Sequence, residues 1–313
     1  MAERAHAKYD RLIAIAKTMP AVSTAVAHPC DEASLRGAKE AAEAGLIVPI
    51  LVGPRGRIRE LASSLKISLE NMELVDAPHS HAAAAQAVEL VRLGRAEVLM
   101  KGSLHSDELL GAVTKRETGL RTERRISHVF IMDVPKHPQT LFITDAAVNI
   151  FPDLMAKRDI VQNAIDLFVG LGLGTPKVAI LSAVETVTVS IPSTIEAAAL
   201  CKMADRGQIT GGLLDGPLAF DNAISPESAR IKGIKSEVAG QADILVVPNL
   251  EAGNMLAKNL SFLSSADAAG IVIGARAPII LTSRADNVRA RMASCAVAVA
   301  YAHSQRIKAP VRS

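Results

Sequence analysis

The sequence predicts an α/β protein, in which short strands alternate with helices along most of the chain. Apolar runs of strand length are followed again and again by amphipathic segments of helix length, which is the pattern of parallel βαβ units. The composition agrees, because 49% of the residues are hydrophobic but only 3% are aromatic. A core built from Ala, Val, Ile and Leu suits helices that pack on a parallel sheet.

Composition and charge narrow the class of protein further. The 313 residues carry 35 basic and 32 acidic side chains without a dense basic stripe, so no nucleic acid partner is expected. The cysteines Cys30, Cys201 and Cys295 are far apart and form no metal-binding or disulfide pattern, which fits a reducing compartment. No secretion signal and no apolar run of membrane-spanning length is apparent. The sequence therefore predicts a cytoplasmic protein without a membrane partner.

The first half of the chain reads as consecutive βαβ units after an N-terminal amphipathic helix. Right-handed crossovers would stack these strands into one sheet with helices on both faces. The expected strands are Val22–Ala27, Leu46–Val52, Glu73–Val75 and Glu97–Met100, and the expected helices are Asp31–Ala44, Arg57–Leu65 and His81–Leu93.

The pattern changes at Ser127, where two strand-like runs are separated by only five residues, Pro135–Gln139. Two strands joined by a short turn predict an antiparallel hairpin. Helical crossovers then resume, so a second α/β unit is expected from about Leu141 onward. Its predicted elements are the helices Pro152–Val169 and Pro192–Arg206 and the strands Lys177–Ser182, Gly212–Leu214 and Asp243–Val247.

Near the C-terminus, a buried strand (Pro278–Leu281) turns directly into a helix that begins at Val288. Either Asp286 or Asn287 is expected to cap this helix. The free N–H groups and the positive end of a helix dipole favour an anion, and Ser283 and Arg284 lie beside them in the sequence. A capped joint that binds nothing is the alternative.

A second candidate loop, Lys101–Asp107, follows the strand that ends at Met100. Gly102 and Ser103 would let backbone N–H groups approach a phosphate, and Lys101 adds a positive charge. The alternative is a plain turn whose helix is capped by Ser106 or Asp107. The following run 115–125 carries five basic residues, which suit either a polyanionic ligand or solvent.

Two further loops follow predicted strands. The first contains Asp215, Asp221 and Asn222 around a Gly-Pro pair, and the second contains Asn254 at the start of a helix. Loops beyond the carboxyl ends of parallel strands line the ligand crevice of such folds. Together, the four loops indicate a cleft between two α/β units that binds a large anionic ligand.

The sequence resembles the phosphate acetyltransferase and phosphate butyryltransferase family over essentially its whole length. The segments that carry the resemblance, in order and spacing, are LMKGSLH, GLRTERRISHVFIMD, DGPLAFDNA, PNLEAGNML, ADAAGIVIGA and APIILTSRADN.

The resemblance implies two α/β/α domains with a deep cleft, in the fold of isocitrate and isopropylmalate dehydrogenases. The expected domains are 1–140 with 276–313, which carries the Ser-Arg pair, and 141–275, which is expected to form a homodimer. The implied reaction is acyl-CoA plus phosphate giving acyl phosphate plus coenzyme A. Coenzyme A is then a substrate, and no bound cofactor or metal is expected.

The family's Ser-Arg pair matches Ser283 and Arg284. By this resemblance Arg284 holds the phosphoryl group with a forked contact, and Ser283 donates to the oxyanion. Substrate-binding roles are expected for the residues of the four loops, namely Lys101, Gly102, Ser103, His105, Asp215, Asp221, Asn222 and Asn254.

Two departures from the acetyl-transferring branch bear on the chemistry. The carboxylate thought to act as its base lies seven residues beyond the Ser, where this chain has Ala290, so Asp286 becomes the candidate base. An Arg of that branch is replaced by Leu110. Both differences favour the butyryl-transferring branch, and the acyl length stays open.

Two other functions are compatible with the same loops. A metal- and NAD(P)-dependent dehydrogenase would use Asp215 and Asp221 as metal ligands, and a non-catalytic protein would bind acyl-CoA without turnover.

Overall fold

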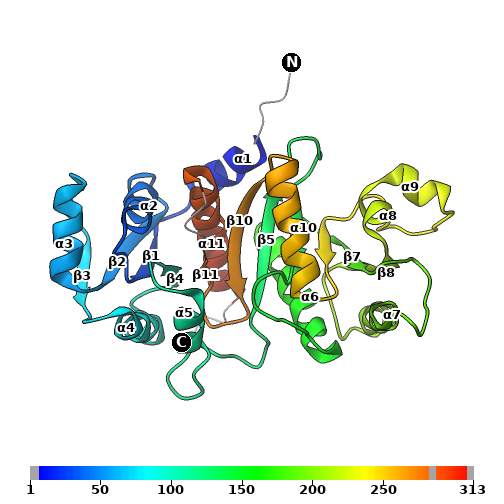
Figure 1. The fold of residues 1–313 in the computed structure, drawn as a ribbon, viewed down its shortest axis with the longest axis horizontal. Helices are drawn as coiled ribbons and strands as arrows, with labels where there is room; N and C mark the ends of the chain where they lie inside the picture. The colour runs from blue at the N-terminus through cyan, green and yellow to red at the C-terminus, as the bar shows by residue number, and fades with distance from the viewer. Residues whose placement is uncertain (1–6, 282–286, 309–313) are drawn as a thin grey trace. The chain divides into compact units, whose positions relative to one another are not determined.

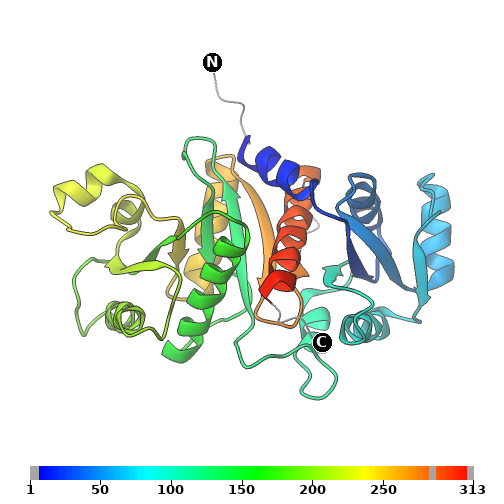
Figure 2. The same ribbon diagram turned by 180° about the vertical axis from the view of Figure 1, so that it is seen from behind.

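The computed structural model describes residues 7–281 and 287–308. The chain divides into two compact units. One consists of residues 9–124 and 269–313 and is called the terminal unit here; the other consists of residues 1–8 and 125–268 and is called the middle unit. Each is an α/β unit with its own run of strands, coloured by residue number in Figures 1 and 2.

The terminal unit contains strands in the order β3-β2-β1-β4-β11-β10. The neighbours from β3 to β11 are parallel, whereas β10 runs antiparallel to β11. The strands are β1 (Val22–Ala27), β2 (Ile47–Gly53), β3 (Glu73–Asp76), β4 (Val98–Lys101), β10 (Asp267–Ile273) and β11 (Ile279–Ile280), with the first two residues of β10 belonging to the middle unit.

Helices cover both faces of this sheet, as right-handed crossovers require. Helix α11 packs against α2 on one face, and α4 packs against α5 on the other, as Figure 1 shows. The helices are α1 (Ala7–Ala16), α2 (Glu32–Glu43), α3 (Arg55–Ser64), α4 (Ser80–Arg92), α5 (Ser106–Val113) and α11 (Val288–Lys308).

The middle unit contains strands in the order β5-β6-β9-β7-β8. The pair β5 and β6 is antiparallel, so the predicted hairpin is confirmed, and the remaining neighbours are parallel. The strands are β5 (Ser127–Asp133), β6 (Leu141–Thr144), β7 (Lys177–Leu181), β8 (Leu213–Leu218) and β9 (Ile244–Val246). The helices are α6 (Leu154–Gly170), α7 (Pro192–Asp205), α8 (Phe220–Ile224), α9 (Pro226–Ile231) and α10 (Leu250–Leu263).

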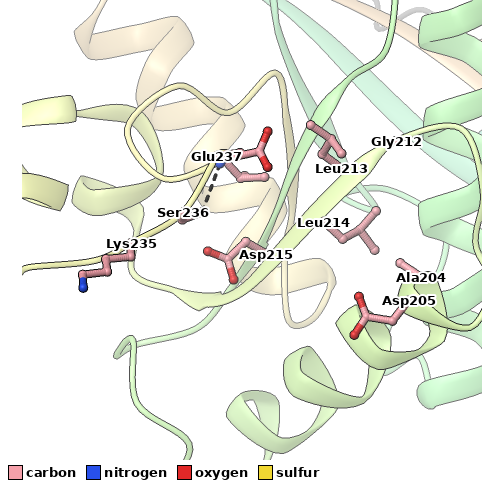
Figure 3. Close-up of a pocket in the computed structure, with 10 residues that line it drawn as sticks. Ala204, Asp205, Gly212, Leu213, Leu214, Asp215, Lys235, Ser236 and Glu237 are labelled. Atoms are coloured by element: carbon pink, nitrogen blue, oxygen red, sulfur yellow. Dashed lines mark hydrogen bonds between the residues drawn. The ribbon is translucent and has the colours of Figure 1, made fainter.

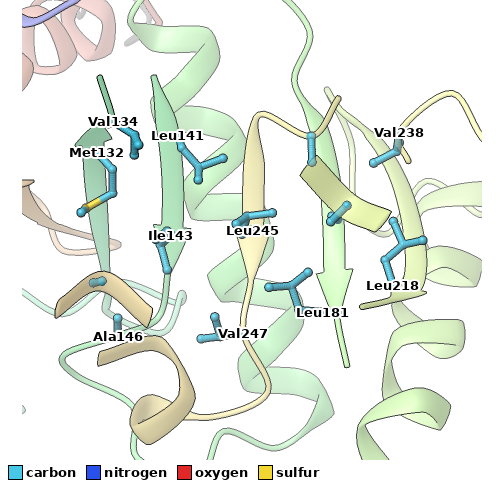
Figure 4. Close-up of a cluster of buried hydrophobic side chains, with 14 of the residues drawn as sticks. Met132, Val134, Leu141, Ile143, Ala146, Leu181, Leu218, Val238, Leu245 and Val247 are labelled. Carbon is cyan, nitrogen blue, oxygen red and sulfur yellow. The ribbon is translucent and has the colours of Figure 1, made fainter. Parts of the chain in front are cut away.

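Side-chain alternation along these strands separates two apolar layers. Leu141 and Ile143 belong to a buried cluster with Leu181, Leu218 and Leu245, drawn in Figure 4. Phe142 points to the opposite face, where its ring meets Phe168 of α6 at 5.1 Å between centroids. A strand buried on both faces reads as a continuous apolar run, which explains the patterns TLFIT and DILVV.

The compact units differ from the expected domain boundaries. Residues 125–140 belong to the middle unit, because β5 pairs with β6 across the whole hairpin. Residues 269–275 belong to the terminal unit, because β10 pairs with β11. The compact units are divided at residues 124 and 268. The domain boundaries at 140 and 275 and the deep cleft between the domains stay predictions.

Candidate functional site

Three parallel strands of the terminal unit end at the same level. Ala27 at the end of β1 lies opposite Lys101 of β4, and Ile280 of β11 lies opposite Met100. Ligands of open α/β sheets bind outside the carboxyl ends of the strands. The loop Gly102–His105 therefore lies between the loop that follows β1 and the point at which β11 ends. The candidate catalytic residues Ser283, Arg284 and Asp286 lie outside the described residues.

Gly102 lets the loop after β4 press against the chain that leaves β1. Its N–H donates to Ala27 O at 2.9 Å, and a Cβ atom would lie 2.3 Å from that oxygen and 2.5 Å from His28 O. No side chain fits at such distances. Lys101 is 8% exposed, and its ammonium donates to Gly102 O at 3.3 Å. Lys101 thus ends β4, and at Gly102 the backbone packs closely against the end of β1.

Ser103 joins the loops after β1 and β4 through its hydroxyl group. Its Oγ donates to His28 O at 2.8 Å, accepts from the N–H of Cys30 at 3.3 Å, and lies 3.0 Å from His28 Nδ1. His28 is half-buried and has a φ of 55°, a left-handed backbone that is uncommon in residues other than Gly, although His, Asn and Asp adopt it more often than most. The geometry thus brings His28 into the predicted Lys101–His105 site.

Charged groups from several elements surround His28. Arg57 of α3 donates to Cys30 O at 3.4 Å, and Asp31 caps α2 by accepting from Ser34 N at 2.8 Å. Burial, followed by the positive charge of Arg57, holds the pKa of His28 below its ordinary value, against the opposing effect of Glu108 and Asp31. Sequence reasoning missed His28 and Arg57; the position of His28 directly after a buried strand was the only signal available.

His105 precedes the first residue of α5, so neither Ser106 nor Asp107 occupies the position before that helix. The backbone N–H of His105 donates to Glu108 Oε1 at 3.3 Å, which satisfies one of the free donors at the helix start. His79 precedes and caps α4, because its Nδ1 accepts from Ala82 N at 3.3 Å. The side chain of His81 is 74% exposed.

The structure places the two positions that depart from the acetyl-transferring branch on helices. Ala290 is 3% exposed in the first turn of α11, and its N–H donates to Asn287 Oδ1 at 2.8 Å. The sequence allowed either Asp286 or Asn287 as the cap of this helix, and this hydrogen bond identifies Asn287 as the cap. Leu110 is half-buried in α5. Neither position offers an ionisable group.

In the middle unit, the buried Asn222 joins a partly exposed group of charged side chains beyond β7 and β8. Its side chain is fully buried, its Nδ2 donates to Glu185 Oε2 at 3.4 Å, and its Oδ1 has no partner within the described ranges. Lys232 binds Glu185 at 2.9 Å and approaches Asp221 at 3.9 Å. The hydrogen bond from Lys232 lowers the pKa of Glu185. Asp221 and Asn222 therefore share one network with Glu185 and Lys232. Neither Glu185 nor Lys232 was predicted from the sequence.

The expectation that Asp215 lies in a loop with Asp221 is wrong. Strand β8 continues through the Gly-Pro pair, and Asp215 pairs with Ala179 inside the sheet. The ladder extends to Leu218, so Asp215 lies in the strand, whereas Asp221 lies beyond it in α8. Asp215 instead borders a cavity of about 390 Å³ lined by Asp205, Lys235 and Glu237, shown in Figure 3.

Asn254 lies in the second turn of α10, and its Nδ2 donates to Ala146 O, in the loop after β6, at 3.2 Å. Gly253 allows this approach, since a Cβ there would lie 2.9 Å from the Cβ of Ala146. Asn249 caps the helix by accepting from Ala252 N at 2.9 Å. The structure thus keeps Asn254 beside the ends of β6 and β9, but in the middle unit, separate from the Lys101–His105 loop of the terminal unit.

Among residues 7–281 and 287–308, no group of three or more His, Cys, Asp or Glu side chains is placed to hold a metal ion. Asp215 and Asp221, the ligands that the dehydrogenase alternative requires, gather no third ligand in that part of the chain. No helix within the same ranges has the length and apolar character needed to cross a membrane.

The fold belongs to the class of α/β proteins with parallel strands, whose ligands bind outside the carboxyl ends of the strands. Residues 79–299 match the Phosphate acetyl/butaryl transferase family, and the chain belongs to that family. Members of this family are acyltransferases, so the protein is an enzyme.

Relatives from both branches are similar over nearly the full length. A phosphate acetyltransferase of Rhizobium meliloti is 72% identical over 299 residues, which cover 96% of this chain and 95% of the relative. A phosphate butyryltransferase of Clostridium beijerinckii is 42% identical over 94% of this chain and 97% of its own length.

The crystal structure of a branched-chain phosphotransacylase from Enterococcus faecalis V583 has a TM-score of 0.79 at 29% identity, covering 90% of this chain and 99% of that chain. A 4-hydroxythreonine-4-phosphate dehydrogenase from Klebsiella pneumoniae has a TM-score of 0.55 at 12% identity, covering 91% of this chain and 100% of its own, and shares the fold alone.

Proposed function

We propose that the protein is a phosphate acetyltransferase that interconverts acetyl-CoA plus phosphate with acetyl phosphate plus coenzyme A. The observation that carries the proposal is the 72% identity to the acetyltransferase of Rhizobium meliloti across 96% of the chain. The loop after β4 supports it, because a buried Lys101 and a closely packed Gly102 suit a phosphate-bearing ligand.

Butyryl-CoA is the second candidate substrate. The specific observations in its favour are Leu110 and Ala290, which replace charged residues of the acetyl-transferring branch, and the 42% identity to a butyryltransferase. A leucine in place of an arginine gives a more apolar surface, which suits a longer acyl chain.

The proposed roles of the site residues differ according to the part of the substrate that each contacts. Arg284 holds the phosphoryl group, Ser283 donates to the carbonyl oxygen as it becomes an oxyanion, and Lys101 adds positive charge near the phosphate. The remaining proposed contacts to coenzyme A or the acyl phosphate are Gly102, Ser103, His105, Asp221, Asn222 and Asn254. Asp286 is the carboxylate that follows the Ser-Arg pair in the sequence and is one candidate for the base.

Three further properties belong to the proposal. Coenzyme A acts as substrate and product, and no bound cofactor takes part. The enzyme works in the cytoplasm, which the three free thiols support. The middle unit joins two copies of the chain, for which exposed apolar side chains of α10 supply a surface.

Thiol release from acetyl-, propionyl- and butyryl-CoA, measured with and without phosphate, tests the function. We expect phosphate-dependent release that is fastest with acetyl-CoA. Release that is fastest with butyryl-CoA would assign the second candidate. No phosphate-dependent release with any of the three would refute the proposed reaction, and coenzyme A binding without turnover would indicate a binding protein.

The variant Arg284→Ala tests the site independently. We expect loss of phosphate-dependent release with an unchanged melting temperature, since the residue lies in a predicted turn and not in the core. Arg59→Ala on the exposed surface of α3 is the matched control and should retain full activity. Near-normal turnover of Arg284→Ala would remove this residue from the site.

A further inference from the structure

We propose that His28 is the catalytic base that removes the proton from the thiol of coenzyme A. The inference rests on the proposed function and gives that reaction a proton acceptor among the described residues.

The inference uses the tautomer of His28 in which Nδ1 carries the hydrogen. The hydroxyl of Ser103 donates to His28 O, its shorter contact at 2.8 Å, and accepts from the N–H of Cys30. The same oxygen lies 3.0 Å from Nδ1, so in this tautomer Nδ1 donates to Ser103. The neutral ring then has its lone pair on Nε2, for which no partner exists in the described part of the chain. A base needs such an acceptor atom.

The backbone holds this ring at the end of the sheet. The φ of 55° at His28 is a left-handed conformation, which persists in residues other than glycine where the surroundings enforce it. The enforcing contacts are the bond from Ser103 N to His28 O at 2.9 Å and the close approach of Gly102 to the same carbonyl. His28 thus follows the end of β1, the strand next to β4, and it is half-buried.

Burial and the surrounding charges together hold the pKa of His28 below its ordinary value. Burial and the guanidinium of Arg57 lower the pKa of His28, and His79 of the α4 cap acts in the same direction. Glu108 of α5 and Asp31 of the α2 cap oppose them without reversing the shift. An imidazole with a pKa below 6.5 is unprotonated at pH 7 and is ready to accept a proton.

At the position where the resemblance to the acetyl-transferring branch implies a base, this chain has Ala290, which has no ionisable group. Cys30 is buried, and burial raises the pKa of its thiol, so it does not ionise readily.

In the direction that consumes acyl phosphate, the S–H bond of coenzyme A breaks and its proton passes to Nε2 of His28. The sulfur forms a C–S bond with the acyl carbon, and the C–O bond to the phosphate breaks with its electron pair on the leaving oxygen. The imidazolium then returns its proton to the departing phosphate. The reverse reaction runs through the same steps.

His28→Asn is the sharpest test, because asparagine tolerates a positive φ and can donate to Ser103 but cannot act as a base. We expect kcat at pH 7 to fall roughly a hundredfold or more, with the KM for acyl phosphate and coenzyme A binding by calorimetry unchanged. Lys66→Asn, which alters another residue with a φ of 55°, is the matched control and should keep full activity.

The pH profile separates a base from a residue with only a structural role. In the wild-type enzyme the rate should be flat above the pKa of His28 and fall below it. In His28→Asn the rate should instead rise about tenfold per pH unit toward the pKa of the free thiol, because only thiolate then reacts. His28→Gly, which also accepts the backbone conformation, should regain activity with added imidazole.

A wild-type rate and pH profile in His28→Asn would overturn the inference, and Asp286→Asn would then identify the base. A wild-type enzyme without any acyl phosphate turnover would instead refute the proposed function, so the two failures are distinguishable.

Discussion

At the scale of single residues, the missing Cβ atom of Gly102 allows the loop after β4 to lie close to the loop after β1. The carbonyl oxygens of Ala27 and His28 occupy the space that a Cβ would need, at 2.3 and 2.5 Å. Both contacts are to backbone, which cannot rotate away as a flexible side chain can. The position of His28 beside Ser103 therefore depends on the absence of a side chain at residue 102.

We expect Gly102→Ala to destabilise the protein by about 1–3 kcal/mol, because overpacking forces the two backbones apart, and to lower activity. Urea unfolding and turnover measure the two effects. Gly111→Ala, in the interior of α5 with open space around it, is the control and should stabilise by about 0.5–1 kcal/mol. Equal stability of Gly102→Ala and wild type would show that the loop can move.

A second residue, His128, is buried with one ring nitrogen that has no hydrogen-bond partner among the described residues. The side chain is 1% exposed, its ring meets Phe130 at 4.4 Å between centroids, and Nδ1 has no partner within the described ranges. Burial lowers the pKa of His128 from 6.5 to about 3. Between these values the unfolded chain binds a proton at this residue and the folded protein does not.

Stability should therefore fall as the pH drops below 6.5, by up to about 1.4 kcal/mol per pH unit from this residue, and the loss should level off near pH 3. His128→Leu replaces the titrating ring with an apolar side chain of similar size. Urea unfolding from pH 7 to pH 4.5 should show a shallower decline for the variant. Parallel declines for the two proteins would contradict the assignment.

At the scale of elements, Ser294 joins α11 to β10. The buried hydroxyl donates to Ala290 O at 2.9 Å, one turn earlier in the helix, and accepts from the N–H of Gly270 at 3.1 Å. Side-chain bonding back to the preceding turn is common for serine in helices. Here the same oxygen also satisfies a strand N–H, so the helix is held in register with the sheet.

Ser294→Ala should cost about 1–3 kcal/mol of unfolding free energy, because it leaves the N–H of Gly270 buried without an acceptor. Ser304→Ala is the control on the same helix, since the hydroxyl of Ser304 donates only to Tyr301 O at 2.7 Å near the surface. The control should change stability by a few tenths of a kcal/mol. A similar small effect at Ser294 would indicate that water replaces the hydroxyl.

At the scale of the whole molecule, helix α10 presents large apolar side chains to solvent. Phe262 is 82% exposed, Leu263 is 80% exposed and Met255 is 65% exposed. Apolar surface that remains exposed in a folded chain commonly marks an interface. These side chains support the proposal that two copies of the chain associate through the middle unit.

Sedimentation velocity should find a particle of twice the 32.9 kDa chain mass. Phe262→Asp should shift the equilibrium toward single chains, because a charge buried without a partner is costly. Val189→Asp alters another exposed apolar residue of the middle unit, 85% exposed, and should leave the association unchanged. A wild-type protein that sediments as single chains would refute the dimer.

The sequence alone determined the succession of elements, because periodicity and capping act over a few residues. The period of the apolar residues predicted the βαβ units, the short turn predicted the β5–β6 hairpin, and the residues before Val288 predicted a cap that Asn287 provides. The motifs also identified the family. All of these features are local in the chain.

Only the tertiary structure decided the pairings between distant segments. Strand β10 is recognised through its pairing with β11, and Asp215 lies inside β8 because β7 continues the ladder past the Gly-Pro pair. The contact of His28 with Ser103 joins residues 75 positions apart in the chain. Sequence patterns report which face of an element is apolar, whereas strand pairing and crossover direction determine which polar side chains meet at the end of the sheet.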